Sequence, residues 1–253
     1  MTPETPEPGR SIGHSRLYVA LDTTDRVRAR ALADALAPLG CGIKLGLEFF
    51  CAEGPDGVRH VAATGAPLFL DLKLHDIPNT VAGGVRAVVP LGARLLTVHA
   101  AGGPAMMEAA AQTARSVAAT AGLPRPHVIG VSVLTSLDRG DLAAVGVGHD
   151  VPDQVARLGA LAEASGLDGM VCSPREVAML RGVVGPDFQL IVPGIRPAGA
   201  TSGDQKRVMT PEDAVAAGAD SLVVGRPITQ ADDPVAAARR IMDMLPPAGV
   251  SVL

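Results

Sequence analysis

Short apolar runs alternate with amphipathic segments along the chain from about Leu17 to Leu245. The first run, residues 17–21, predicts a buried strand that ends on Asp22. A helix is expected next, because Thr24 or Asp25 can cap its first turn and Gly40 can end it. Its apolar face is predicted to consist of Val27, Leu32, Leu36 and Leu39.

The same strand-then-helix unit repeats along the sequence. Strands are predicted near residues 17–21, 41–45, 67–72, 94–98, 127–133, 169–172, 188–193 and 220–224. Helices are predicted at residues 104–121, 153–165, 174–181, 211–217 and 234–245, four of them with proline at the start. Such alternation implies right-handed crossovers and a parallel sheet.

Eight such units in about 240 residues predict a single-domain α/β protein, a closed (β/α)₈ TIM barrel over residues 15–253. Residues 1–14, rich in Pro, Glu and Thr, are expected to form a flexible tail. An open, doubly wound sheet is the alternative architecture. The turn after the first strand, Ala-Leu-Asp-Thr-Thr-Asp, lacks the glycine pattern with which such sheets bind dinucleotides, so the barrel is favoured.

The amino-acid composition agrees with this fold and limits the classes of molecule that the protein is expected to bind. Hydrophobic residues make up 47% of the chain, with no Trp, one Tyr and four Phe, so aliphatic side chains and Ala must form the core. The net charge is −4 and no basic run could follow a phosphate backbone, so nucleic acid is not an expected partner.

The location expected from the sequence is the cytoplasm. The first fifteen residues contain no apolar run of signal-peptide length, and no segment reaches the ~18 continuous apolar residues of a membrane span. Cys41, Cys51 and Cys172 lack metal-ligand spacing, and we interpret them as small core residues in a reducing compartment; a catalytic thiol is a minor alternative.

The most informative stretch is residues 71–80, Asp-Leu-Lys-Leu-His-Asp-Ile-Pro-Asn-Thr, directly behind the apolar run 67–70. Asp71 and Lys73 are two residues apart, so on a strand their side chains leave the same face and can touch. Burying such a pair costs several kcal/mol in desolvation, which favours a functional site over a structural one. A surface ion pair, worth about 0 to 1 kcal/mol, is the alternative.

Other strands also end on polar groups, and the catalytic residues of a barrel lie at the carboxyl ends of its strands. We therefore expect a ring of polar side chains around one mouth. Its members are Asp22, Lys44, Asp71, Lys73, Thr97, His99, Ser132, Thr135, Ser136, Ser173, Arg196 and Arg226.

The last two strands predict a phosphate site. Gly194 and Gly225 permit close backbone approach, and Arg226 supplies a fixed cation beside exposed amides. Glycines that only turn the chain, with an Arg paired to a helix acid, are the alternative. The polar stretch 196–207 is too long for a simple connector and is predicted to be a lid, or otherwise a surface loop.

Together these residues resemble the orotidine 5′-phosphate (OMP) decarboxylase family from about Leu17 to Leu245. The most specific motif is Asp-x-Lys-x-x-Asp-Ile-Pro-Asn-Thr at 71–80. Val-Pro-Gly-Ile-Arg-Pro at 192–197 and Gly-Arg-Pro-Ile-Thr at 225–229 match two further family motifs. The resemblance implies conversion of OMP to uridine 5′-monophosphate (UMP) in pyrimidine biosynthesis, with neither cofactor nor metal.

The resemblance also implies roles for individual residues. Lys44, Asp71, Lys73 and Asp76 would form a catalytic tetrad, with Lys73 protonating C6. Asp76 and Thr80 would reach into the site of a partner subunit in a homodimer, which suits an Asp three residues from Lys73 and followed by Pro78. The substrate contacts implied are Asp22 and Lys44 to the ribose, Thr135 to the pyrimidine, and Gln205, Gly225 and Arg226 to the phosphate, with Arg196 close by. His75 has no clear chemical task.

Three other functions stay open at this stage. A hexulose-phosphate synthase shares Asp-x-Lys-x-x-Asp but uses Mg²⁺, and the Pro-Asn-Thr extension and Gln205 argue against it. An aldolase would need Lys73 or Lys44 as a neutral Schiff-base amine, whereas acidic neighbours favour the charged form. A catalytically dead barrel that binds a phosphorylated metabolite is disfavoured by the intact Asp-Lys-Asp set.

Overall fold

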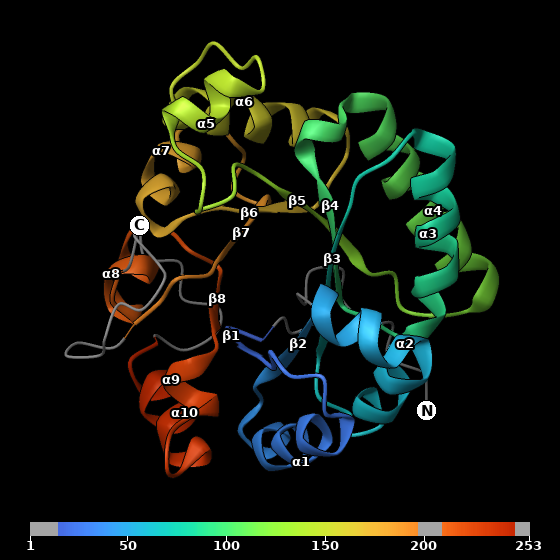
Figure 1. Ribbon diagram of the computed structural model, residues 1–253, viewed down its shortest axis with the longest axis vertical. Coiled ribbons are helices and arrows are strands. Elements are labelled where there is room, and N and C mark those ends of the chain that lie inside the picture. The colour runs from blue at the N-terminus through green and yellow to red at the C-terminus, as the bar shows by residue number, and fades with distance from the viewer. Residues whose placement is uncertain (1–14, 197–208, 246–253) are drawn as a thin grey trace, which may run out of the picture.

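The computed structural model describes residues 15–196 and 209–245, and the strands of this part form a closed parallel barrel (Figure 1). The strands are β1 (Leu17–Ala20), β2 (Gly42–Gly46), β3 (Leu68–Leu74), β4 (Leu95–His99), β5 (His127–Val131), β6 (Gly169–Val171), β7 (Gln189–Val192) and β8 (Ser221–Val224). Each lies within two residues of its predicted range, and pairing of β1 with β8 closes the sheet. The predicted (β/α)₈ barrel is therefore confirmed and the open sheet excluded.

Helices surround this ring on its outer side (Figure 1). They are α1 (Arg26–Leu36), α2 (Leu47–Ala62), α3 (Pro78–Val88), α4 (Pro104–Ala121), α5 (Arg139–Ala144), α6 (Val151–Ala164), α7 (Val177–Arg181), α8 (Pro211–Ala216), α9 (Arg226–Thr229) and α10 (Pro234–Asp243). None of these helices is both long and apolar enough to cross a membrane. The predicted tail, and the 197–207 part of the predicted lid, lie outside the described residues.

The predicted core face of α1 was wrong at its first position. Asp25 caps the helix through bonds from the amides of Val27 and Arg28, and Val27 itself is 71% exposed. The buried residues of the helix are Leu36, as predicted, together with Ala29 and Ala33. Their spacing of four and three residues is that of one helix face, and small side chains there let α1 pack closely against the barrel.

Two apolar cores lie on the two sides of the strands. The larger fills the space between strands and helices, and the smaller lies inside the barrel. The interior core consists of Tyr18, Ala20, Phe69, Leu95, Ile129, Ile191 and Val223. Because Ala20, Phe69 and Val223 also line the pocket described below, this core forms the floor of the pocket.

The tight packing of the interior core predicts that one methyl group added at Gly42 will destabilise the fold. A Cβ added at Gly42 would lie 2.4 Å from the buried ring of Tyr18, which packs edge-on against Phe69. We expect Gly42→Ala to destabilise the fold by about 1 to 3 kcal/mol, as overpacking of a filled core does. Urea unfolding measures this, with Gly148→Ala as the control because its Cβ would meet nothing within 4 Å. Equal stability of both variants would contradict this packing.

Barrel closure depends on the residues just before β1. The Ser15 hydroxyl accepts a bond from Gly42 N at 2.9 Å and contacts the Gly40 carbonyl, next to β2. The Ser15 carbonyl accepts a bond from Ser221 Oγ at 2.9 Å, across a separation of 206 residues. One short segment thus joins β1 to both of its neighbours.

Candidate active site

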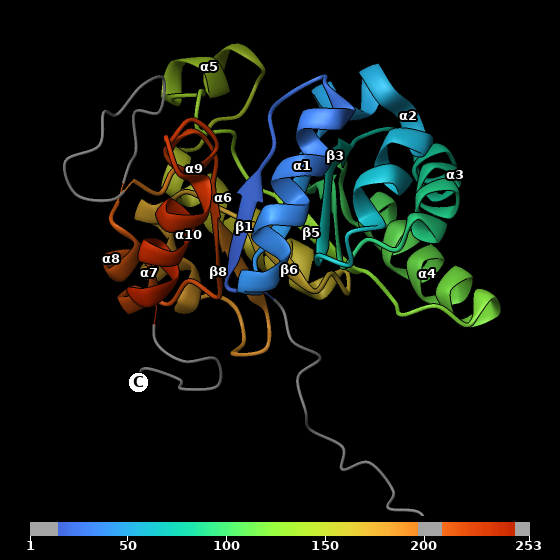
Figure 2. The same ribbon diagram turned by 90° about the horizontal axis from the view of Figure 1, so that it is seen from below.

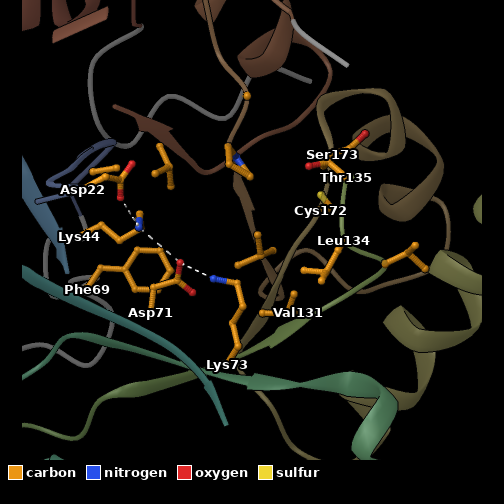
Figure 3. A pocket seen from close by; sticks show the side chains of 16 residues that line it. Asp22, Lys44, Phe69, Asp71, Lys73, Val131, Leu134, Thr135, Cys172 and Ser173 are labelled. Atoms are coloured by element: carbon orange, nitrogen blue, oxygen red, sulfur yellow. Dashed lines mark hydrogen bonds and ion pairs between the residues drawn. The ribbon is translucent and has the colours of Figure 1, made fainter. Parts of the chain in front are cut away.

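A pocket of about 240 Å³ opens at the carboxyl end of the barrel (Figure 3), the end toward which β1 points in Figure 2. One side of it is charged and the opposite side is mostly apolar. Its lining residues are Ala20, Asp22, Lys44, Phe69, Asp71, Lys73, Val131, Val133, Leu134, Thr135, Val171, Cys172, Ser173, Pro193, Gly194 and Val223.

The charged side is a chain of alternating acids and bases from three adjacent strands (Figure 3). Lys44 Nζ lies 3.6 Å from Asp22 Oδ1 and 3.5 Å from Asp71 Oδ2. Lys73 Nζ lies 2.7 Å from the same Asp71 oxygen. One carboxylate oxygen therefore faces two ammonium groups, and both cations are held at the pocket wall.

Strand geometry explains how these groups meet. Parallel pairing sets Ala20 beside Lys44 and Gly46 beside Asp71, so neighbouring strands deliver their polar ends at one level. The pairing of β3 with β4 is irregular between Leu70 and Leu74. Within this irregularity Lys73 has a φ of 51°, a left-handed conformation that costs on the order of 1 to 3 kcal/mol for a residue other than glycine. Strain of this kind is typical of functional positions.

Asp71 is a buried carboxylate, with 8% of its surface exposed. Burial by itself raises the pKa of this carboxyl, but the charges of Lys44 and Lys73, and hydrogen bonds from Lys73 and Thr97, outweigh it and hold the pKa below its usual value. Asp71 is therefore ionised at neutral pH. A charged group of this kind is expensive to bury and is kept where its charge is used.

The opposite side of the pocket was not anticipated from the sequence. Val131, Val133, Leu134 and Val171 line it, together with the thiol of Cys172. Burial raises the pKa of this thiol far above its ordinary value, so Cys172 acts as an apolar side chain. The signal was present in the sequence, because these residues flank the ends of predicted strands, but it could not be separated from that of ordinary core residues.

Two hydroxyl side chains lie near this apolar wall. Thr135 and Ser173 both line the pocket, opposite the charged chain (Figure 3). Thr135 follows β5, as its predicted contact with the pyrimidine requires, and Ser173 follows β6. They supply polar groups that a ring with hydrogen-bonding edges could contact.

The ends of β7 and β8 bring two guanidinium groups together. Arg196 is buried and donates a hydrogen bond to the Ile195 carbonyl, while Arg226 begins α9 and is exposed. Burial lowers the pKa of Arg196, and the nearby positive charge of Arg226 lowers it further. Gly194 has a φ of 80°, which favours glycine there. Converging cations of this kind suit a phosphate.

Asp76 and Thr80 lie elsewhere. Both are exposed, Thr80 in the first turn of α3, and neither lines the pocket within the described ranges. Asp76 Oδ1 accepts a bond from Ile77 N at 2.6 Å, and Ile77 is 66% exposed. The structure thus separates these residues from the charged chain of their own barrel.

His75 packs against His99, with ring centroids 5.3 Å apart. Burial, followed by the charges of His75 and Lys73, lowers the pKa of His99. Neither ring lines the pocket in the part of the chain that the structure describes. The predicted ring of polar groups is therefore smaller than expected, because Thr97, His99, Ser132, Ser136, Arg196 and Arg226 lie outside its lining within the described residues. Gln205 is outside the described residues.

Comparison with known proteins agrees with this geometry. Residues 15–241 match the family model described as Orotidine 5'-phosphate decarboxylase / HUMPS family. The chain is 55% identical over 225 residues to an orotidine 5'-phosphate decarboxylase of Paramagnetospirillum magneticum, covering 89% of this chain and 96% of that protein. It is 57% identical over 226 residues to the Rhodospirillum rubrum protein of the same name, covering 89% and 92%.

Solved structures show the same relationship. The crystal structure of orotidine 5'-phosphate decarboxylase from Lactobacillus acidophilus has a TM-score of 0.82 and 36% identity, covering 91% of this chain and 99% of that one. The enzyme from Pyrococcus horikoshii gives 0.71 and 27%, covering 90% and 98%. Barrel fold and sequence thus agree, and the chain belongs to the orotidine 5'-phosphate decarboxylase / HUMPS family.

Proposed function

We propose that this chain is an OMP decarboxylase, a carboxy-lyase that converts OMP to UMP in pyrimidine biosynthesis. The observation that carries the proposal is the chain Asp22–Lys44–Asp71–Lys73, in which a buried carboxylate lies between two ammonium groups. Relatives that share about half of its residues carry the same activity in their names. A cytoplasmic location stays a prediction from the sequence.

The charged chain suits the chemistry of this reaction. Loss of CO₂ from C6 leaves a carbanion that the pyrimidine ring delocalises poorly, so the site must stabilise negative charge electrostatically. Lys73 supplies a positive charge whose position is fixed by its 2.7 Å contact with Asp71. The same ammonium then donates its proton to C6. Asp71 holds Lys73 charged and oriented beside the departing carboxylate, and Lys44 balances the charge of Asp71.

We assign the remaining substrate contacts from the resemblance to the family; of these residues, Asp22, Lys44 and Thr135 line the pocket. Asp22 and Lys44 bind the ribose, and Thr135 binds the pyrimidine on the opposite side. Gly225 and Arg226, with Gln205, bind the phosphate, and Arg196 adds a second positive charge there. Burial lowers the pKa of Arg196 and the positive charge of Arg226 lowers it further, and two cations at the ends of β7 and β8 suit an anionic group.

We further infer a homodimer in which Asp76 and Thr80 complete the partner's site. Three features support this inference: both side chains are exposed, they follow directly on the strand that carries Lys73, and Ile77 between them exposes a large apolar side chain. An exposed apolar residue inside a functional motif is typical of an interface.

The test of the proposed function is an assay with OMP. Loss of OMP absorbance is followed with the purified chain in the presence and absence of EDTA. Turnover that is unchanged by EDTA is the expected result. Activity that disappears on chelation would favour the metal-dependent synthase chemistry, and absence of any turnover would leave a metabolite-binding protein.

Arg226→Ala is expected to weaken catalysis through the phosphate. The loss in kcat/KM for OMP should be roughly 2 to 5 kcal/mol if the ion pair is desolvated in the complex. Steady-state kinetics with OMP and with orotidine, which lacks the phosphate, measures this. An equal loss with both substrates would contradict the assignment of Arg226 to the phosphate.

A further inference from the structure

We propose that Thr97 is a positioning residue that holds Asp71 and Lys73 in their working arrangement. The inference rests on the proposed function, because it assigns Thr97 a part in the same reaction. Thr97 belongs to β4, is fully buried, and does not line the pocket within the described residues. Its effect on the substrate must therefore pass through other side chains.

The first step of the argument is the irregular pairing of β3 with β4. Leu70 pairs with Leu96 and Leu74 pairs with Val98, so four residues of advance in β3 correspond to two in β4. The extra length is a bulge between those two pairs, and it contains Asp71 and Lys73. Bulges redirect side chains and are common next to active sites. Thr97 is the residue of β4 that lies opposite this bulge.

The hydroxyl of Thr97 bridges both charged residues of the bulge. Thr97 Oγ1 donates a hydrogen bond to Asp71 Oδ1 at 2.9 Å. It also accepts one from the backbone amide of Lys73, again at 2.9 Å. A threonine hydroxyl has one proton to donate and lone pairs to accept with, so both contacts can exist together. A single atom thus fixes a side chain and a backbone amide.

Each of these bonds has a consequence for the charged chain. Because Oδ1 of Asp71 is held by Thr97, Oδ2 is the oxygen that faces both Lys44 and Lys73. The bond to the Lys73 amide holds the residue whose φ of 51° is, among described residues, the single positive value outside glycine. Without the hydroxyl, the carboxylate can rotate and the Lys73 backbone can relax toward an ordinary conformation.

The size of the expected effect follows from how geometry enters catalysis. A displacement of about 1 Å in a reacting group costs on the order of 100-fold in rate. We therefore expect Thr97→Val to lower kcat about 100-fold while UMP affinity changes by less than about threefold, since binding contacts stay intact. Thr97→Ser keeps the hydroxyl and should retain kcat within about tenfold of wild type.

Thr64→Val is the matched control. The Thr64 hydroxyl also donates one bond, to the Val61 carbonyl at 2.9 Å, and accepts one, from Ala66 N at 3.3 Å. Thr64 lies before β3, at the opposite end of that strand from Lys73. Thr64→Val therefore shows what the loss of two hydroxyl hydrogen bonds does when they lie away from the pocket. Thr97→Ala serves as the second hydroxyl-free variant should Thr97→Val fail to fold.

The outcomes separate this inference from the proposed function. Loss of kcat in Thr97→Val, with activity kept in Thr97→Ser and Thr64→Val, supports the positioning role. Wild-type kcat in Thr97→Val, or equal losses in the Val and Ser variants, would overturn it. Wild type without activity on OMP would overturn the proposed function instead. Crystal structures of Thr97→Val then decide the positioning role: an unchanged Lys73 φ and an unchanged Lys73–Asp71 contact would overturn it, and a change in either supports it.

Discussion

We expect replacement of Lys73 by alanine to abolish turnover of OMP while leaving UMP affinity within about an order of magnitude. The physical reason is that the ammonium is needed for the carbanion, which the product does not contain. Electrostatic stabilisation and proton donation are each worth about 100-fold or more, so a loss of at least about 10⁴-fold in kcat is expected. Single-turnover kinetics and UMP titration measure the two quantities.

Arg59→Ala is the control for this variant. Arg59 lies on α2 and pairs with exposed Asp56, so its removal takes one positive charge from the surface at a residue that does not line the pocket. Its kcat should match that of wild type. If Lys73→Ala lost UMP affinity as severely as rate, Lys73 would be a binding residue and the assignment of proton donor would be wrong.

We expect mixing of two inactive variants, Lys73→Ala and Asp76→Ala, to restore activity when subunits exchange. In a mixed dimer with shared sites, one site contains both substitutions and the other site contains neither. At equal mixing with random exchange, about a quarter of wild-type activity per total site should return. The assay follows OMP turnover after incubation under conditions that exchange subunits.

The control for this experiment is each variant incubated alone under the same conditions. Exchange itself is checked by mass spectrometry of mixed dimers that carry a tag on one variant. A mixture that forms mixed dimers yet stays inactive would place Asp76 in the site of its own subunit. The exposed position of Asp76 would then need another explanation, such as movement of the 75–80 segment over its own pocket.

The fold could be predicted because each strand is marked by a short apolar run in its own stretch of sequence. Runs such as 17–21 and 67–70 are apolar, short and followed by an aspartate, and the structure has strands at both. The contact between Asp71 and Lys73 was predicted because two residues of one regular strand share a face, but the structure makes this contact within a bulge in which Lys73 is left-handed. Arg196 and Arg226 belong to motifs at the ends of the last two strands, where a barrel binds phosphate.

What could not be predicted depends on contacts between distant segments. Val27 is exposed because of the orientation in which α1 packs against the barrel. The spacing of apolar residues along α1 does not by itself determine that orientation. The bond between Thr97 and Asp71 joins residues 26 positions apart, and the left-handed φ of Lys73 arises from a register that only the paired strands define. The apolar wall around Val171 forms only when β5 and β6 lie side by side.

The bonds that join Ser15 to β2 and to β8 have a consequence for synthesis on the ribosome. β1 is made early, but its partner strand β8 is made last. β8 begins with Ser221, whose hydroxyl donates a hydrogen bond to the Ser15 carbonyl. Until then the growing chain is an open parallel sheet with two unpaired edges, and such edges invite pairing with other chains. The nascent protein is therefore most exposed to aggregation just before its last strand emerges.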